Sequence, residues 1–288
     1  MNKTLKTTLM LFVISLFLAA AARTFAFETL SPDAQLQITI FNVGKGDCIL
    51  LRQGGKAMMI DTGYIETAPM VLSKLKDMGV ISIDCLLLSH YDKDHVGGAG
   101  QIITELPVGE IYGPNYTKDK KAYRKYVEAL KDKNIAPHIL TEGAVKFHIG
   151  GIGVALYPSI MSEGMVSNDY SVICVVTFGE KRFVFMGDAT DKRMTDFLRV
   201  CGPKYDFMKL PHHGMFLRNS APFKELLKTT NPEYCVITDS PEYKDNKGLL
   251  LMLDVYGTKK TCQTRHGEIS LTSDGQTITM EQTPANGQ

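Results

Sequence analysis

The hydrophobic residues of the chain follow two spacings, which together predict a protein of mixed strands and helices. Short apolar runs bounded by glycine or polar turns predict strands. Such runs occupy 36–43, 48–52, 57–60, 85–88, 111–112, 145–147, 152–157, 171–178, 182–186, 207–210, 234–238, 268–272 and 277–281. Apolar residues that recur on one face of a helical repeat predict helices. These lie at 67–78, 99–106, 117–133, 191–200, 221–228 and 249–256.

The order of these elements repeats once along the chain. A predicted hairpin that ends at Asp61 is followed by a helix, a strand and a loop that contains His90. A second predicted hairpin ends at Asp188, and a helix, a strand and a loop that contains His212 follow it. Two β-rich halves with outer helices would pack sheet against sheet, so that their loops meet at one edge. The pattern therefore predicts an α+β protein.

The stretch at 89–98, Ser-His-Tyr-Asp-Lys-Asp-His-Val-Gly-Gly, has the densest group of potential metal ligands. These ligands are His90, Asp92, Asp94 and His95. The first two are two positions apart and point to the same side of an extended chain, whereas the last two follow a turn and point elsewhere. One loop thus offers the two pairs of ligands that two adjacent metal ions need. A charged surface loop is the alternative, but the buried strand before it and the Gly-Gly after it favour a metal loop.

The first residues predict a secretory signal peptide at 1–26. Lys3 and Lys6 give a basic start, and an apolar run at 9–22 follows. This run is short for a membrane span. An uncleaved membrane anchor is the alternative interpretation. We therefore expect a secreted or cell-surface domain at 27–288 with no transmembrane segment after cleavage.

Charge gives no support for broad electrostatic binding of nucleic acid. The chain has 32 Lys and Arg against 31 Asp and Glu. Removal of residues 1–26 takes away Lys3, Lys6 and Arg23 and no acid, which leaves 29 bases against 31 acids. Such a balance gives little general attraction for a polyanion. The predicted helix at 117–133 is nevertheless basic, and it either steers an anionic polymer or simply presents a solvated face.

The six cysteines do not form a metal-binding pattern. No Cys-x-x-Cys spacing is present, which argues against a cysteine zinc site. Four of them lie inside apolar runs: Cys48, Cys85, Cys174 and Cys235. A buried cysteine behaves as a small apolar residue, so we expect mostly free, buried thiols.

The motif His-x-Asp-x-Asp-His-x-Gly-Gly at 90–98 resembles the metal loop of the metallo-β-lactamase-fold hydrolases. The commoner form of that loop has histidine where this chain has Asp92. The aspartate resembles the branch that contains the extracellular domain of the DNA-uptake channel ComEC, and teichoic-acid phosphorylcholine esterases are relatives. The turn Val-Gly-Lys-Gly-Asp at 43–47 resembles the Val-Gly-Gln-Gly-Asp turn of the family. The resemblance covers nearly the whole mature chain and implies a four-layer αββα sandwich.

The resemblance also implies the residues of the site. The implied metal ligands are His90, Asp92, Asp94, His95, Asp188 and His212. Asn168 begins an Asn-x-x-Ser stretch that stands where other branches place a third histidine, and whether it is a ligand stays open. Asp61 resembles a structural aspartate that hydrogen-bonds within the metal loop, and Ser171 would support the site. Asp94 and His213 are the candidate catalytic residues, and His213 would either donate a proton to a leaving group or cap its loop.

The implied ligand set favours two divalent ions. It contains three carboxylates and three imidazoles, and Asp92 replaces an imidazole by a harder oxygen donor. This favours Mn²⁺ or Mg²⁺ more than an all-histidine pocket would, and Zn²⁺ stays possible. A hydroxide that bridges both ions would attack the substrate, so no side-chain nucleophile is needed.

The resemblance therefore implies a secreted dinuclear-metal hydrolase, a phosphodiesterase or nuclease that acts on DNA or another phosphodiester. One alternative is a phosphorylcholine-esterase-like hydrolase of cell-wall phosphodiesters. Another is a degenerate binding module without turnover, and β-lactam hydrolysis is a more distant reading. Met215 stands where relatives have serine, and 245–247 stands where they often have His-Pro, which leaves the substrate pocket undefined. The oligomeric state is also open.

Overall fold

The computed structural model of the protein describes residues 34–160, 164–243 and 246–284. The predicted signal peptide at 1–26 lies outside these ranges. Within them, no helix is both long enough and apolar enough to cross a membrane.

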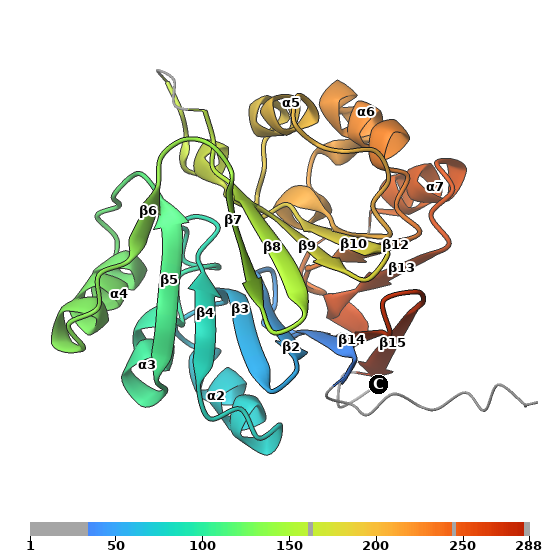
Figure 1. The fold of residues 1–288 in the computed structure, drawn as a ribbon. Coiled ribbons are helices and arrows are strands. Elements are labelled where there is room, and N and C mark those ends of the chain that lie inside the picture. The colour runs from blue at the N-terminus through green and yellow to red at the C-terminus, as the bar shows by residue number, and fades with distance from the viewer. Residues whose placement is uncertain (1–33, 161–163, 244–245, 285–288) are drawn as a thin grey trace, which may run out of the picture. The chain divides into compact units, whose positions relative to one another are not determined.

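The first of two mixed sheets has the strand order β15-β14-β1-β2-β3-β4-β5-β6 (Figure 1). Strands β1 to β3 are antiparallel neighbours, whereas β3 to β6 run parallel. The C-terminal hairpin β14–β15 extends this sheet beside β1, so the first and last strands complete one sheet. The bounds are β1 Leu36–Ile40, β2 Cys48–Gln53, β3 Lys56–Thr62, β4 Ile83–Leu87, β5 Val108–Pro114, β6 His138–Leu140, β14 Gly267–Ser273 and β15 Ile278–Pro284.

The second sheet has the order β13-β12-β11-β10-β9-β8-β7. Strands β7 to β10 are antiparallel neighbours, and β10 to β13 run parallel. The bounds are β7 Val145–Ile149, β8 Ile152–Tyr157, β9 Ile173–Phe178, β10 Lys181–Phe185, β11 Phe207–Lys209, β12 Tyr234–Ile237 and β13 Lys260–Gln263.

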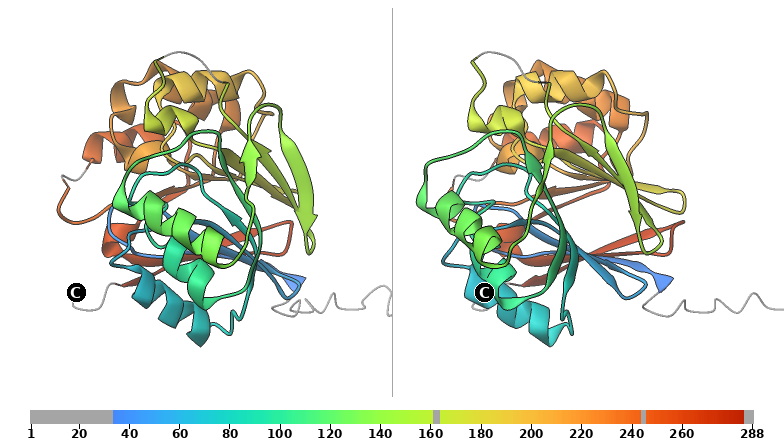
Figure 2. Two further views of the ribbon diagram at one scale, coloured as in Figure 1. Left: turned by 90° about the vertical axis from the view of Figure 1, so that its left-hand side faces the viewer. Right: turned by 60° about the vertical axis from the view of Figure 1, so that its left-hand side comes forward.

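Helices cover the outer face of each sheet, and Figure 2 shows the two sets on opposite sides of the paired sheets. The first set comprises α2 Ala68–Asp77, α3 Ala99–Glu105 and α4 Lys121–Asp132. The second comprises α5 Asp191–Leu198, α6 Ala221–Thr230 and α7 Lys247–Val255. Short 3-10 helices lie in the connections between the described elements: η2 Ser167–Tyr170, η3 Pro211–Gly214, η4 Leu217–Asn219 and η5 Thr264–His266. These four layers confirm the predicted αββα sandwich.

Strand β4 shows how the sequence produces this layering. Cys85 and Leu87 pack in the core between the sheets, whereas Leu86 packs against the first set of helices. Successive side chains of a strand point to opposite faces, so a strand that is covered on both faces reads as an unbroken apolar run. This explains why 85–88 contains no polar residue although the strand leads directly into the most polar loop of the chain.

The structure confirms the predicted internal repeat. The hairpin β2–β3 carries Asp61 near its end, and the chain continues through α2 and β4 to the loop of His90. The hairpin β9–β10 leads to Asp188 and continues through α5 and β11 to His212. In each half the second hairpin strand pairs in parallel with the strand that follows the helix. The two loops therefore leave the carboxyl ends of equivalent strands.

Two local predictions differ from the structure. The helix predicted at 117–133 begins only at Lys121, so Lys118 lies in the extended segment before it. The polar stretch at 164–170, for which the sequence predicts neither a helix nor a strand, contains the 3-10 helix η2. The cysteine prediction is confirmed, because all six thiols are free and all but Cys201 are buried.

Candidate metal centre

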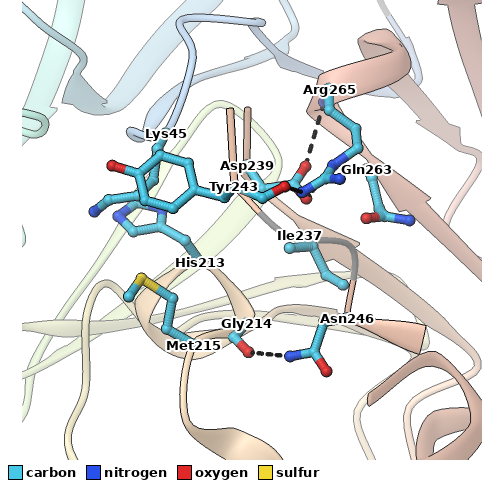
Figure 3. Close-up of a pocket in the computed structure, with 10 residues that line it drawn as sticks. All are labelled: Lys45, His213, Gly214, Met215, Ile237, Asp239, Tyr243, Asn246, Gln263 and Arg265. Carbon is cyan, nitrogen blue, oxygen red and sulfur yellow. Dashed lines mark hydrogen bonds and ion pairs between the residues drawn. The ribbon is translucent and has the colours of Figure 1, made fainter. Parts of the chain in front are cut away.

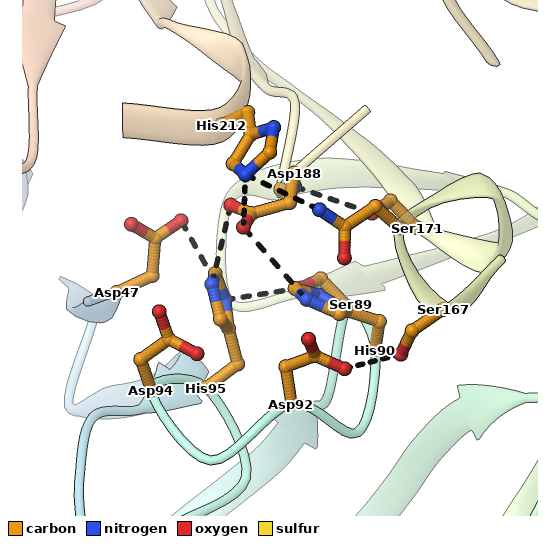
Figure 4. Close-up of polar contacts among 12 residues, drawn as sticks. Asp47, Ser89, His90, Asp92, Asp94, His95, Ser167, Ser171, Asp188 and His212 are labelled. Atoms are coloured by element: carbon orange, nitrogen blue, oxygen red, sulfur yellow. Dashed lines mark hydrogen bonds and ion pairs between the residues drawn. The ribbon is translucent and has the colours of Figure 1, made fainter. Parts of the chain in front are cut away.

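The candidate ligands meet at one edge of the sandwich, where loops from both halves converge (Figure 4). The loop after β4 carries His90 to His95, and the residues after β10 carry Asp188. The 3-10 helix after β11 carries His212 and His213, and both have positive φ, 47° and 53°. Such a conformation is unfavourable for residues with a side chain and concentrates at functional sites. The strained backbone conformation of this turn therefore orients two adjacent imidazoles into the site.

One oxygen of Asp188 faces a tightly buried cluster, called here the deep group, which consists of Asp94, His95, Asp188 and His213. Asp188 Oδ1 lies 3.2 Å from His95 Nε2 and 3.3 Å from His213 Nε2. His213 Nε2 also lies 3.6 Å from Asp94 Oδ2. One ligand atom from each of the four residues lies within 4.8 Å of the others. A single cation could therefore contact all four.

The other oxygen of Asp188 faces a more open cluster, called the outer group, which consists of His90, Asp92, Asn168 and His212. Asp188 Oδ2 lies 3.9 Å from His90 Nε2 and 3.8 Å from His212 Nε2. Asn168 Nδ2 donates to His212 Nε2 at 3.3 Å. The side chains of Asp92 and His212 are 30% and 25% exposed. Asp188 is thus shared between two groups that differ in access to solvent.

Unpaired polar atoms show that both groups fit cations. His90 Nε2, His95 Nε2, His213 Nε2 and Asp188 Oδ1 are all buried and make no hydrogen bond in the described structure. Buried nitrogen and oxygen atoms are nearly always paired, so three unpaired imidazole nitrogens around one carboxylate that itself has an unpaired oxygen require an explanation. Imidazole and carboxylate donors in this arrangement are the usual ligands of divalent transition metals. The donor set therefore fits divalent ions on both sides of Asp188.

Asp61 fixes the orientation of His95. Its carboxylate accepts from the Ser89 backbone N–H at 2.7 Å and from Ser89 Oγ at 2.6 Å. Its Oδ2 lies 2.8 Å from His95 Nδ1. A carboxylate on one ring nitrogen sets the tautomer and directs the other nitrogen to the metal. Asp61 thereby turns His95 Nε2 toward Asp188.

Asp47 fixes His213 in a similar way, but through a hydroxyl group. Thr238 Oγ1 donates to Asp47 Oδ1 at 2.6 Å and lies 3.0 Å from His213 Nδ1. Asp47 Oδ2 pairs with Lys209, whose side chain is fully buried. The sequence analysis assigned no site role to Asp47, Thr238 or Lys209. The only sequence signal was that Asp47 ends the family-like turn at 43–47.

Ser171 supports Asp188 directly. Its hydroxyl oxygen accepts from the Asp188 backbone N–H at 3.2 Å. The buried Arg193 donates through Nε to the Ser171 carbonyl oxygen at 2.8 Å. This links the strand β9, the helix α5 and the shared carboxylate into one rigid support.

The charges of the deep group perturb its own protonation. Burial alone would raise the pKa of Asp188, but the neighbouring His213 and His95 outweigh it and hold that pKa well below its usual range. Burial would lower the pKa of His95, but Asp188 and Asp61 raise it well above its usual value. The pKa of His213 is likewise raised, chiefly by Asp188, against the effect of burial. In the metal-free protein, protons on these imidazoles neutralise the carboxylates, and a bound cation would take their place.

The outer imidazoles behave differently. Burial and the neighbouring His95 lower the pKa of His90 to about 4. Burial also lowers the pKa of His212, with the nearby Asp188 acting in the opposite direction. Both rings are therefore neutral near pH 7, which is the form that binds a metal ion.

The two adjacent histidines face different sides of Asp188. From the sequence, His212 was expected to be the last ligand, and His213 was expected either to donate a proton to a leaving group or to cap its loop. The structure places His213 in the deep group with Asp94, whereas His212 faces the outer oxygen of Asp188. Their ring centroids are 6.1 Å apart with planes at 66°, so each ring serves a different side.

A cavity of about 50 Å³ adjoins the deep group (Figure 3). Lys45, His213 and Tyr243 line one side of it, and Arg265 lies on the other. Arg265 Nε donates to Asp239 Oδ2 at 2.6 Å, which holds that wall in place. Met215 and Asn246, where the sequence departs from the pattern of its relatives, also line this cavity. The departures thus fall beside the ligands and not among them.

Residues 41–228 match the family model described as the Metallo-beta-lactamase superfamily. The chain is 27% identical over 207 residues to Recombination protein 2 of Haemophilus influenzae, a match that covers 70% of this chain and 24% of that protein. It is 24% identical over 208 residues to Competence protein ComA of Neisseria gonorrhoeae, covering 71% of this chain and 27% of that protein. The chain therefore spans about a quarter of the length of these relatives. These matches confirm the ComEC-like resemblance.

Among solved structures, the chain is similar to the metallo-beta-lactamase fold protein YhfI of Bacillus subtilis. The TM-score is 0.54 and the sequence identity is 13%, and the match covers 79% of this chain and 95% of that one. At this identity the likeness concerns the fold alone.

Proposed function

The chain belongs to the metallo-beta-lactamase superfamily, whose fold is that of metal-dependent hydrolases, and we propose that it is a phosphodiesterase that uses two divalent ions. One observation carries this proposal: Asp188 Oδ1 faces the buried, unpaired Nε2 atoms of His95 and His213, and Asp188 Oδ2 faces the outer group, in which His90 Nε2 is buried and unpaired. When bound, the two ions would polarise a phosphoryl oxygen and lower the pKa of water toward neutrality. No serine or cysteine nucleophile is required.

The residues of the chain hold this centre in place. Asp188 orients both groups, and Asp61 and Thr238 keep the deep imidazoles turned toward it. His213 has its Nδ1 on Thr238 and its Nε2 among carboxylates, so its contacts support a ligand role and not proton donation. His212 and Asn168 lie on the exposed side, where a substrate can approach. The outer ligand role of Asn168 requires its amide oxygen to face the ion, which a half-turn of the amide group provides.

DNA is the proposed substrate class, with other phosphodiesters included. The support comes from the names of two relatives, Recombination protein 2 and Competence protein ComA. A hydrolase of cell-wall phosphodiesters is the second candidate, because the cavity beside His213 is small and suits a compact ester arm better than a nucleobase. The full set of ligand side chains argues against a binding module that has lost turnover.

The direct test uses metal-free protein refilled with Mn²⁺, Mg²⁺ or Zn²⁺ and assayed on single-stranded DNA and on bis-(p-nitrophenyl) phosphate. We expect hydrolysis of the small diester with at least one of these ions and its loss on chelation. Cleavage of DNA separates the first candidate from the second. A folded protein that hydrolyses neither substrate with any of the three ions contradicts the proposal.

We also propose that the protein acts outside the cytoplasm, on the basis of the basic start and apolar run of its first residues. The mature chain should then begin between Arg23 and Glu28. Mass spectrometry of the protein from its own cells checks this, and an intact Met1 on cytoplasmic protein would contradict it.

A further inference from the structure

Each aspartate of the metal loop is paired with a lysine that comes from elsewhere in the fold. Lys45, in the turn between β1 and β2, places its Nζ 3.0 Å from Asp94 Oδ2. Lys118, in the segment between β5 and α4, contacts Asp92 Oδ1 through its Nζ. The lysine side chains are 17% and 24% exposed. One partly exposed ammonium group therefore lies beside each of the two carboxylates of the metal loop.

Each lysine has further contacts besides its carboxylate partner. Lys118 Nζ also lies 3.2 Å from Ser167 Oγ, and Ser167 Oγ lies 2.8 Å from the hydroxyl of Tyr116. That hydroxyl in turn accepts from the Tyr91 backbone N–H at 2.6 Å, which ties the arrangement to the metal loop. Lys45 lines the cavity beside His213, with its Nζ 5.9 Å from the ring centroid of Tyr243. Both ammonium groups are thus held beside the metal ligands, at positions that solvent can reach.

A count of formal charges shows what these lysines contribute. The described site has five carboxylates, Asp47, Asp61, Asp92, Asp94 and Asp188, against three ammonium groups, Lys45, Lys118 and Lys209. With neutral imidazoles the balance is a charge of −2, and two divalent ions convert it to +2. Without Lys45 and Lys118 the loaded site would have no net charge. These two residues alone therefore make the loaded centre attractive to an anion.

Metal binding changes the partners of both lysines. A divalent ion that binds Asp92 or Asp94 neutralises the carboxylate that the lysine now pairs with, and it repels the ammonium group. A lysine has a flexible four-carbon stem, so the group can move a short distance without leaving the mouth of the site. The nearest new partner is an anionic oxygen of a molecule that binds at the same ions.

We propose that Lys45 and Lys118 bind the anionic oxygens of the substrate and select a phosphodiester monoanion over neutral esters. This inference rests on the proposed function and specifies which residues set its substrate class. Lys45 acts on the deep side of Asp188 and Lys118 on the outer side, so the phosphoryl group lies between two ammonium groups. A neutral ester gains nothing from either of them.

The test measures binding of dimethyl phosphate, a monoanionic diester, to Mn²⁺-loaded protein by calorimetry. The variants are Lys45→Gln and Lys118→Gln, and the matched control is Lys93→Gln. Lys93 belongs to the same loop and is exposed, but its Nζ is directed toward the ring of Tyr64, 6.0 Å from the centroid, and not toward a ligand carboxylate. Manganese per chain is measured in every variant by mass spectrometry.

We expect each of the two variants to weaken dimethyl phosphate binding about tenfold, as loss of a charge-assisted hydrogen bond does. Manganese content should be unchanged in every variant, and the Lys93→Gln control should bind dimethyl phosphate as the parent does. Unchanged dimethyl phosphate affinity in both variants overturns the inference, and so does a loss of affinity that follows a loss of manganese. If the parent protein hydrolyses bis-(p-nitrophenyl) phosphate in either case, the proposed function stands while this inference falls. If the loaded parent neither binds nor hydrolyses a diester, both fall.

Discussion

On the Oδ1 side of Asp188 the ligands are buried and each imidazole is oriented by a carboxylate network. On the Oδ2 side His90 is fully buried, but Asp92 and His212 are partly exposed. His95 rests on Asp61, and His213 rests on Thr238 and through it on Asp47. In the outer group, His212 contacts only the amide of Asn168 among the outer ligands, and Asp92 is held by Lys118 and Ser167.

This difference in burial indicates that the two groups around Asp188 have different tasks, tight ion binding in the deep group and substrate access in the outer group. A buried, pre-oriented ligand set loses little entropy when an ion binds, so the deep group should bind its ion more tightly. An exposed set gives a substrate access to its ion and allows its ligands to adjust. We infer that the deep group holds an ion permanently and that the outer group supplies the side from which the substrate approaches.

The largest effect should come from Asp188→Ala, because this residue alone belongs to both groups. We expect loss of both ions and a fall in phosphodiesterase activity of about a thousandfold or more. Metal per chain and turnover are measured on the same preparation, with circular dichroism as the check on folding. A folded variant with the metal content of the parent would show that Asp188 does not join the two groups.

Alanine at each of the two adjacent histidines should give unequal results. His213→Ala should remove the deep ion and lower activity by about a hundredfold or more, since the loss of one ligand opens the buried site. His212→Ala should retain the deep ion and lower activity by about tenfold. The metal content of each variant decides the comparison, and the reverse order would show that His212, and not His213, holds the deep ion.

Asp47→Asn should act on stability first. The substitution leaves the fully buried Lys209 without its anionic partner, and removal of one member of a buried pair costs about 3–5 kcal/mol. Denaturant unfolding measures the change in the free energy of unfolding. Asp92→Asn, at a partly exposed pair with Lys118, is the matched control and should cost less than about 1 kcal/mol. Equal costs at the two positions would contradict the difference in burial that separates the deep and outer sides.

The smallest effect should be the shift in metal preference of Asp92→His. An imidazole suits Zn²⁺ better than a carboxylate does, so the ratio of Zn²⁺-supported to Mn²⁺-supported activity should rise severalfold. Some activity should be lost because the imidazole is longer and misplaces the ion. A flat or lower ratio in folded protein would mean that Asp92 does not bind the outer ion directly.

The sequence was sufficient for the fold, and it predicted that the candidate ligands meet at one edge, because both depend on local patterns. Strand β4 is an apolar run that leads directly into the ligand loop, and Asp61 and Asp188 lie at or just after the ends of equivalent strands, β3 and β10. These signals lie within a few residues of the feature that they predict. The internal repeat then relates the two halves without knowledge of any long-range contact.

The remaining features depend on geometry that no local pattern encodes. His212 and His213 are neighbours of the same type, and only the positive φ of both residues sends one ring to each side of Asp188. Thr238 and Asp47 are 191 positions apart, and neither belongs to a ligand motif. Lys118 was placed inside a helix, whereas the helix begins at Lys121 and leaves Lys118 able to reach Asp92.

The central claim is that Asp188 joins one tight and one weaker ion site, and titration of metal-free protein with Mn²⁺ by calorimetry tests it most directly. We predict two ions per chain that bind in separate steps, with the first at least about tenfold tighter than the second. His212→Ala should weaken or abolish only the second step, and His213→Ala should remove the first. Two equal steps, a single ion in the parent protein, or a His212→Ala variant that loses the tighter ion would contradict the account.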